Sequence, residues 1–360
     1  MTGLNIAELL ASAGARANHI IPASRLAPLW GHCVSVERAP GKGFGRNNCR
    51  APFGPAMHRQ APSPSAFLNK TSLGPLHFAL EFRIIGADFF PCSSKAYFMT
   101  TLFSALIDSA SFNENGLSAA ITEDWMQGRT TYGGLAAALC LETALRTFPD
   151  LPPLRSAMVS FIGPAGAAVE ARAKILRQGK SVTFVEADLI AEKGLATRCI
   201  FVFGGDRQSA FNKSYSPRPA LPGPDDCEEY IPDGHGPSFL EHFDRLLAKG
   251  ARPMTGATEH DHFIWARHRD ERATGVPAFL ALADMPPPAV LPMFTGPAPL
   301  SSMTWQLNFL TENPMTQDRW WLLESRADYA GNGYTSQDML IWNHGGDLVL
   351  AGRQSVAIFA

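Results

Sequence analysis

The sequence lacks the features that mark several common protein classes. Its longest uninterrupted apolar run, residues 135–141, falls far short of the roughly 20 residues that cross a bilayer. The six cysteines form no CxxC pair, which argues against a zinc ribbon or a disulfide framework and predicts a reducing, cytoplasmic location. No GxSxG motif occurs, so a serine hydrolase of the nucleophile-elbow type lacks support. The net charge of -2 argues against general binding to nucleic acid or to an anionic membrane surface.

Acidic residues are scarce in the first 98 residues. This segment holds ten Lys and Arg against four Asp and Glu, whereas the rest of the chain holds 21 against 29. Pro and Gly interrupt it too often for a packed core, as at residues 38–46 and 61–65. Three interpretations stay open: a transit peptide, a disordered regulatory arm, or an extension that precedes a natural start at Met99. In each case we expect residues 1–98 to form a poorly structured extension outside the chemistry.

Residues 99–204 follow an α+β pattern. A helix predicted at residues 135–148 is apolar on nearly every face, which is typical of a buried helix, and Asp150 and the following prolines end it. Strand-like runs flank this helix, at residues 117–121, 157–162, 169–177, 181–190 and 195–203. A buried helix followed by consecutive strands predicts an antiparallel sheet that curls around the helix.

The same order recurs in residues 238–360, after a linker rich in Pro and Gly at residues 205–237. The second predicted helix, residues 278–284, ends at three prolines. Further strands are predicted at residues 243–247, 262–268, 302–310, 320–329, 335–343 and 348–359. The two halves therefore look like a diverged duplication, with both helices side by side against one continuous sheet.

Aligning the two halves shows where their polar residues differ. Pairing the glycines at the two helix starts sets Glu142 opposite Asp284, and pairing the arginines of the last strands sets Cys199 opposite Gln354. The two halves therefore differ in polar residues at matching places.

Several local motifs resemble the type II acyl-CoA thioesterases with tandem hotdog units. They are residues 122–134 (TEDWMQGRTTYGG), 280–284 (LALAD) with the following prolines, 302–305 (SMTW) and 353–354 (RQ). The resemblance covers roughly residues 99–360. It implies an α+β double hotdog, with one unit at residues 99–204 and the other at 238–360. It also implies hydrolysis of acyl-CoA in lipid metabolism without cofactor or metal, and it leaves a homodimer open.

In that family, an Asp on the second helix, a Thr or Ser in the next strand and a Gln near the end of the last strand hold the attacking water. By their positions, Asp284, Thr304 and Gln354 of this sequence match these three family residues, and the resemblance implies the same roles for them. The chemistry is reasonable in itself, because water attacks a thioester poorly unless a base accepts its proton. Burial raises the pKa of a carboxylate and so suits it to that role.

The start of the first helix is the predicted substrate contact. Backbone N–H groups there can stabilise an oxyanion, and Gly133 and Gly134 allow close approach, so Tyr132, Gly133 and Gly134 are the candidate binding residues. Close packing of the helix explains the glycines equally well.

Two other functions stay open. One is a non-catalytic protein that binds acyl groups or acyl-CoA, and the other is a hotdog dehydratase, which usually pairs a His with an acid. His262 and His268 share one face of a predicted strand, but the sequence suggests no further ligand, so no metal site is predicted.

Overall fold

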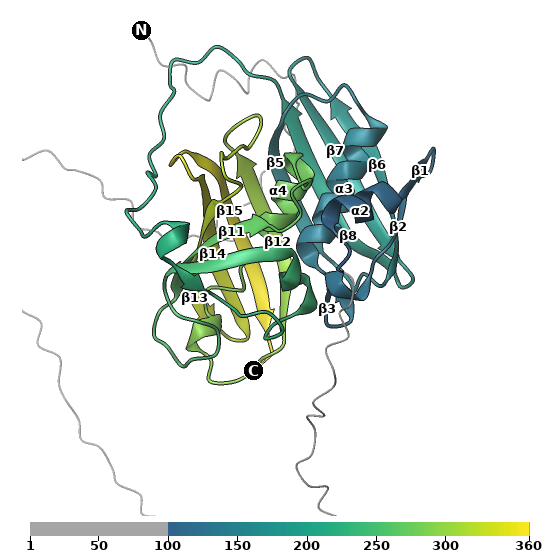
Figure 1. Ribbon diagram of the computed structural model, residues 1–360. Helices are drawn as coiled ribbons and strands as arrows, with labels where there is room; N and C mark the ends of the chain where they lie inside the picture. The colour runs from purple at the N-terminus through teal and green to yellow at the C-terminus, as the bar shows by residue number, and fades with distance from the viewer. Residues whose placement is uncertain (1–99, 360) are drawn as a thin grey trace, which may run out of the picture. The chain divides into compact units, whose positions relative to one another are not determined.

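The computed structural model describes residues 100–359, so the prediction for residues 1–98 lies outside the described residues. The first half contains a central helix and five longer strands, coloured blue to teal in Figure 1. Its elements are α2 (Phe103–Ser109), β1 (Ser111–Asn113), β2 (Gly116–Ala120), a 3-10 turn (Glu123–Trp125), β3 (Met126–Gln127), β4 (Thr130–Thr131), α3 (Gly133–Thr147), β5 (Leu154–Phe161), β6 (Ala168–Gln178), β7 (Val182–Ala191) and β8 (Gly194–Gly204).

The second half repeats this order, coloured green to yellow in Figure 1. Between the halves lie a 3-10 turn (Pro224–Asp226), β9 (Glu228–Glu229) and a second 3-10 turn (Ser238–His242). The second half has β10 (Phe243–Lys249), β11 (Asp261–His268), α4 (Gly275–Ala283), a 3-10 turn (Leu291–Met293), β12 (Leu300–Phe309), β13 (Trp321–Gly331), β14 (Tyr334–Asn343) and β15 (Leu348–Ile358).

All the longer strands belong to one antiparallel sheet of 13 strands. The strand order is β1-β2-β6-β7-β8-β5-β12-β15-β14-β13-β11-β10-β9. Strands β5 and β12 join the halves in the middle, where Val159 pairs with Trp305. On each side of this seam the equivalent strands follow in the same sequence, so the predicted duplication and the continuous sheet are both confirmed.

The register of the sheet turns this symmetry into residue equivalences. Val159 pairs with Cys199 in β8, and Trp305 pairs with Gln354 in β15. Because Val159 and Trp305 face each other across the central seam, their partners Cys199 and Gln354 occupy corresponding places, as the sequence alignment predicts. The same reasoning sets Ala187 of β7 against Gln337 of β14.

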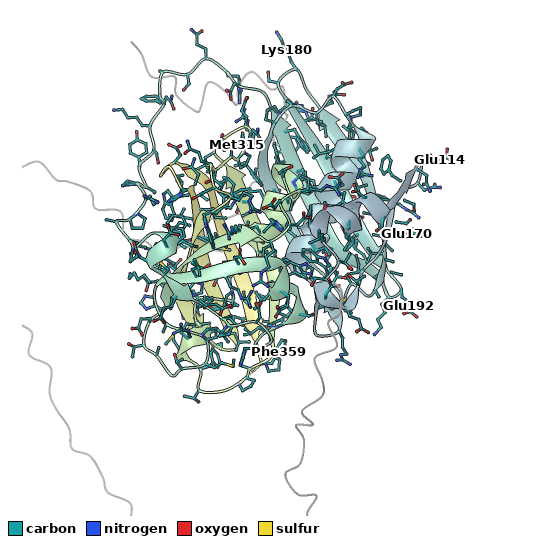
Figure 2. All side chains as sticks on the ribbon, in the orientation of Figure 1. Glu114, Glu170, Lys180, Glu192, Met315 and Phe359 are labelled. Carbon is teal, nitrogen blue, oxygen red and sulfur yellow. The ribbon has the colours of Figure 1, made fainter. Side chains whose placement is uncertain are left out.

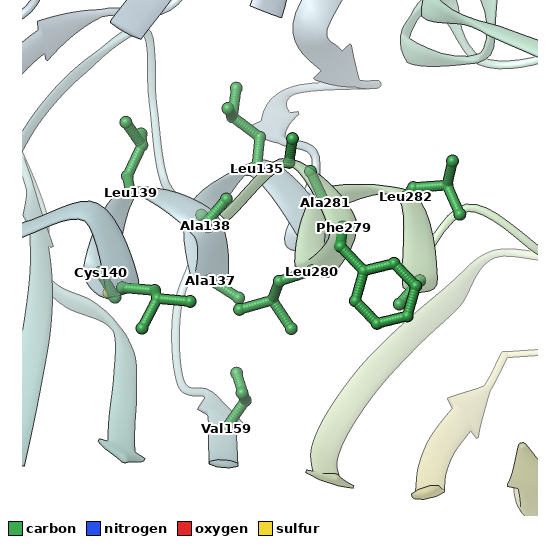
Figure 3. Packing of buried hydrophobic residues seen from close by; sticks show 14 of the residues in the cluster. Leu135, Ala137, Ala138, Leu139, Cys140, Val159, Phe279, Leu280, Ala281 and Leu282 are labelled. Atoms are coloured by element: carbon green, nitrogen blue, oxygen red, sulfur yellow. The ribbon is translucent and has the colours of Figure 1, made fainter. Parts of the chain in front are cut away.

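The helices α3 and α4 pack against each other on the inner side of the sheet (Figures 1 and 3). Ten residues of α3 are buried, including every residue from Gly134 to Leu141. The helix is buried so fully because sheet strands and α4 together enclose it. Gly134 allows this approach, since a Cβ there would lie 2.6 Å from the carbonyl oxygen of Ala281. Charged side chains such as Lys180 and Glu192 project outward from the turns (Figure 2). The predicted α+β double hotdog is thus confirmed.

Candidate active site

Asp284 caps the C-terminal end of α4 and meets side chains from the last strands. Its Oδ1 accepts a hydrogen bond of 3.0 Å from Nε2 of Gln354, and the same Nε2 lies 3.2 Å from the Ser302 hydroxyl. The helix ends here because Pro286 and the two following prolines cannot continue it. The structure therefore brings together Asp284 and Gln354, two of the residues predicted to hold the water.

A chain of hydrogen bonds fixes which way the Gln354 amide faces. The backbone N–H of Ala289 donates to Oε1 of Gln337 at 2.8 Å, so the amide nitrogen of Gln337 must lie on the other side. That nitrogen donates to Oε1 of Gln354 at 2.9 Å. Gln354 is therefore left with its NH2 group directed at the Asp284 carboxylate.

The other side of the carboxylate faces the N-terminus of α3, which belongs to the first half. A Cβ at Gly133 would lie 2.8 Å from Oδ2 of Asp284, so only glycine leaves room for the carboxylate at this position. The first N–H groups of a helix lack partners within it and attract negative charge. The site is thus composite, with the carboxylate from one half and the helix end from the other.

Burial raises the pKa of Asp284 from 3.8 to about 7, against the hydrogen bonds from Gln354 and the backbone of Gly134, which lower it. Its position at the C-terminal end of α4 acts in the same direction as burial, because the helix dipole is negative there. A carboxylate that titrates near neutral pH is suited to general-base catalysis.

Tyr132 lies beside this site as a packing residue. Its ring stacks on Phe239 with 4.0 Å between centroids, and its hydroxyl donates to the carbonyl oxygen of Ala281 at 2.6 Å. These contacts tie the start of α3 to α4, and contact between substrate and Tyr132, Gly133 or Gly134 stays a prediction.

The prediction that the Thr304 hydroxyl converges on Asp284 and Gln354 is wrong. A β-bulge lies between Ser302 and Thr304, and it turns Thr304 to the exposed face while Trp305 points inward. Ser302 supplies the hydroxyl beside Gln354 instead. Strict alternation along a strand fails at a bulge, because the extra residue shifts which side chains face inward.

Glu142, the counterpart of Asp284 in the sequence alignment, has a different setting. Helix α3 continues past it to Thr147, and its carboxylate forms an ion pair of 2.7 Å with Arg146 one turn later. Its position is that of a helix-surface residue.

Two family models match the sequence. The acyl-CoA thioesterase N-terminal domain matches residues 121–204, and the acyl-CoA thioesterase C-terminal domain matches residues 224–358. The chain belongs to the acyl-CoA thioesterase family. No curated protein sequence matches the chain.

Solved structures share the fold of this thioesterase-family chain. A hotdog-fold protein of unknown function from Alicyclobacillus acidocaldarius is 21% identical, with a TM-score of 0.64, covering 70% of this chain and 96% of its own. A thioesterase II from Thermobifida fusca YX is 19% identical, with a TM-score of 0.61 and coverages of 73% and 99%. The acyl-CoA thioesterase II TesB2 from Mycobacterium marinum is 18% identical, with a TM-score of 0.54 and coverages of 69% and 94%.

Sequence reasoning missed Ser302 and Gln337. For Ser302 a signal existed, because the family pattern admits either Thr or Ser at that place. For Gln337 the signal was a lone amide among the inward positions Thr335, Met339 and Ile341 of β14. A buried polar side chain in an apolar row marks a hydrogen-bond network.

Within residues 100–359 no group of three or more His, Cys, Asp and Glu side chains is placed to hold a metal ion. In the same part of the chain no helix is both long and apolar enough to cross a membrane.

Proposed function

We propose that this member of the thioesterase family hydrolyses acyl-CoA to a free acid and CoA, with Asp284 as the general base. The observation that carries the proposal is the Asp284 carboxylate itself. It is oriented by Gln354, seated against the start of α3 and has a pKa raised to about 7.

In the proposed reaction, a water molecule lies between the Asp284 carboxylate and the Ser302 hydroxyl. Asp284 accepts a proton as the water oxygen attacks the thioester carbonyl carbon. The carbonyl oxygen becomes an oxyanion, which N–H groups of the first turn of α3 other than that of Gly134 can stabilise. The C–S bond then breaks, and the proton on Asp284 passes to the departing CoA thiolate.

Gln354 is proposed to position the base. Its amide nitrogen holds one carboxylate oxygen, and Gln337 holds its amide oxygen in turn. A fixed carboxylate places the attacking water in line with the carbonyl, and such positioning contributes strongly to rate.

The test is thiol release from a panel of acyl-CoAs of different chain length, using the purified full chain in catalytic amounts. We expect multiple turnovers on at least one member, with kcat/KM that falls about tenfold per pH unit below pH 7 as Asp284 becomes protonated. Stoichiometric binding of acyl-CoA without turnover would instead establish a binding protein and contradict the proposal.

A further inference from the structure

Several buried side chains, among them Arg245 and His268, present a polar atom that finds no partner within the described residues, and four others with such atoms lie along the inner face of the sheet between β9 and β12. The atoms of these four are the Tyr230 hydroxyl, both ring nitrogens of His262, the Trp305 indole nitrogen and the Ser325 hydroxyl. Each of these four side chains belongs to a residue at most 1% exposed. Leaving a buried polar atom without a partner costs about 1–3 kcal/mol, so several in one region call for an explanation.

His262 and Ser325 lie in one transverse row on the inner face of the sheet, and the side chains of Tyr230 and Trp305 approach its two ends. His262 pairs with Ser325, Ser325 with Met339, and Met339 with Gly352, across the four strands β11, β13, β14 and β15. Tyr230 extends the row beyond His262, since their rings lie 5.8 Å apart. At the opposite end, the Trp305 indole nitrogen lies 3.7 Å from the position of a Cβ on Gly352.

This row, which we call the polar row, is adjacent to the candidate active site. Ala327 follows Ser325 at the next inward position of β13 and pairs with Gln337, which bonds Gln354. From strand spacing and rise, Ser325 lies about 12 Å from Gln354. That distance is within the span of a medium-length acyl chain whose carbonyl sits at Asp284.

The first half shows how the same row looks when it serves only as core. Leu117 pairs with Ala171, Ala171 with Leu189, and Val159 occupies the place of Trp305. Apolar residues thus stand where the second half has His262, Ser325 and Trp305. Packing of the fold therefore does not require polar groups at these three positions.

The row offers neutral donors and acceptors. Burial lowers the pKa of His262 to about 4, so its imidazole is neutral at pH 7, with one nitrogen donating and the other accepting. Burial also raises the pKa of the Tyr230 phenol, which keeps its proton. An uncharged hydroxyl or keto oxygen matches such a set, whereas a buried carboxylate or ammonium would lack a counter-charge.

We propose that the polar row binds an oxygen substituent on the acyl chain, so that hydroxyacyl or ketoacyl thioesters are preferred over unsubstituted ones. The proposal rests on the proposed function, since it assumes that the acyl carbonyl lies at Asp284. Tyr230, His262 and Ser325 act as specificity residues, and Trp305 donates to the part of the chain nearer the thioester.

The experiment compares dodecanoyl-CoA with its monohydroxy isomers, scanned along the chain. We expect the full-length protein to favour one hydroxyl position by about tenfold or more in kcat/KM, because a site built to hydrogen-bond a substrate hydroxyl discriminates against the analogue that lacks it. Equal kcat/KM for all isomers and for the unsubstituted chain would overturn the proposal, while still supporting hydrolysis.

Variants localise the preference. Ser325→Ala installs the residue of the first half and Tyr230→Phe removes only a hydroxyl. Each should reduce the preference severalfold while kcat/KM on dodecanoyl-CoA stays within about twofold, as thermal melting verifies folding. Ser301→Ala and Tyr334→Phe, at exposed positions, are the matched controls. A preference that survives both Ser325→Ala and Tyr230→Phe contradicts the assignment of the row.

If no acyl-CoA is hydrolysed, the proposed function fails and the row is tested by binding. Non-hydrolysable thioether analogues with and without the hydroxyl are then titrated by calorimetry. Tighter binding of one hydroxylated analogue, lost in Ser325→Ala, upholds the polar row, and equal affinity overturns it.

Discussion

The two halves of the sheet share one topology and differ in what they place on its inner face. Ser302, Gln337 and Gln354 of the second half stand where the register sets Ala157, Ala187 and Cys199 in the first. The first half thus forms an ordinary core, while the second half forms a hydrogen-bond network. Duplicated scaffolds therefore need not carry duplicated sites.

The helices differ in a way that completes this asymmetry. Helix α3 has 15 residues and keeps Glu142 within its length, whereas α4 has nine and stops so that Asp284 is its cap. The shorter helix directs its carboxylate toward the start of the longer one. Each half thus contributes what the other lacks: the first an N-terminal helix end, the second the side chains.

The largest effect on activity is expected when the carboxylates of Asp284 and Glu142 are replaced in turn. Asp284→Asn should lower kcat about 10²–10⁴-fold, the usual contribution of general-base catalysis, because the amide cannot accept the proton. Glu142→Gln should stay within about twofold, since Glu142 pairs only with Arg146 among residues 100–359. Steady-state thiol release measures both, and equal losses in the two variants would contradict a single site.

Removing the amide groups of the second half's network should give intermediate losses of activity. Gln354→Ala should lower kcat/KM about 10–100-fold, and Gln337→Ala about tenfold, because Gln337 only orients Gln354. Thr304→Ala, on the exposed face of the same sheet, is the control and should have no effect. A Gln337→Ala variant with full activity would show that the amide relay is dispensable.

The close contact between the Asp284 carboxylate and Gly133 at the start of α3 is tested by adding one methyl group. Gly133→Ala should lower kcat/KM about tenfold, because the new Cβ would lie 2.8 Å from Oδ2 of Asp284 and displace the carboxylate. Gly166→Ala is the control, as a Cβ there meets no atom of the described residues within 4 Å. Similar activities in the two variants would place the catalytic carboxylate elsewhere.

The smallest expected effect is on stability. The raised pKa means that the folded protein binds a proton at Asp284 that the unfolded chain releases between pH 4 and 7. Stability from this group therefore falls as pH rises through that window, at a cost on the order of 4 kcal/mol above pH 7. Asp284→Asn removes the titration, so its melting temperature relative to wild type should rise by about 5 °C between pH 5 and 8.

Melting curves of both proteins at several pH values measure this difference. Glu142→Gln serves as the matched control and should track wild type. If the melting-temperature difference between Asp284→Asn and wild type does not change with pH, folding does not raise the pKa of Asp284.

Local patterns in the sequence were sufficient for the architecture. Alternating apolar residues predicted the longer strands, the all-apolar stretch from Leu135 to Leu141 predicted a buried helix, and the prolines after Asp284 ended the second helix. Aligning the halves also paired Cys199 with Gln354, which the register confirms. These features depend on residues close in the chain or on the repeat itself, so one sequence is enough to find them.

Only the tertiary structure decided which hydroxyl and which amides meet Asp284. The bulge after Ser302 reverses the facing of Thr304, and bulges depend on how neighbouring strands pair. Gln337 of β14 contacts the site by its hydrogen bond to Gln354 on the neighbouring strand β15. Gly133, at the start of α3, lies beside Asp284 at the end of α4. Such contacts join residues distant in the chain, so their geometry exists only once the two halves have packed together.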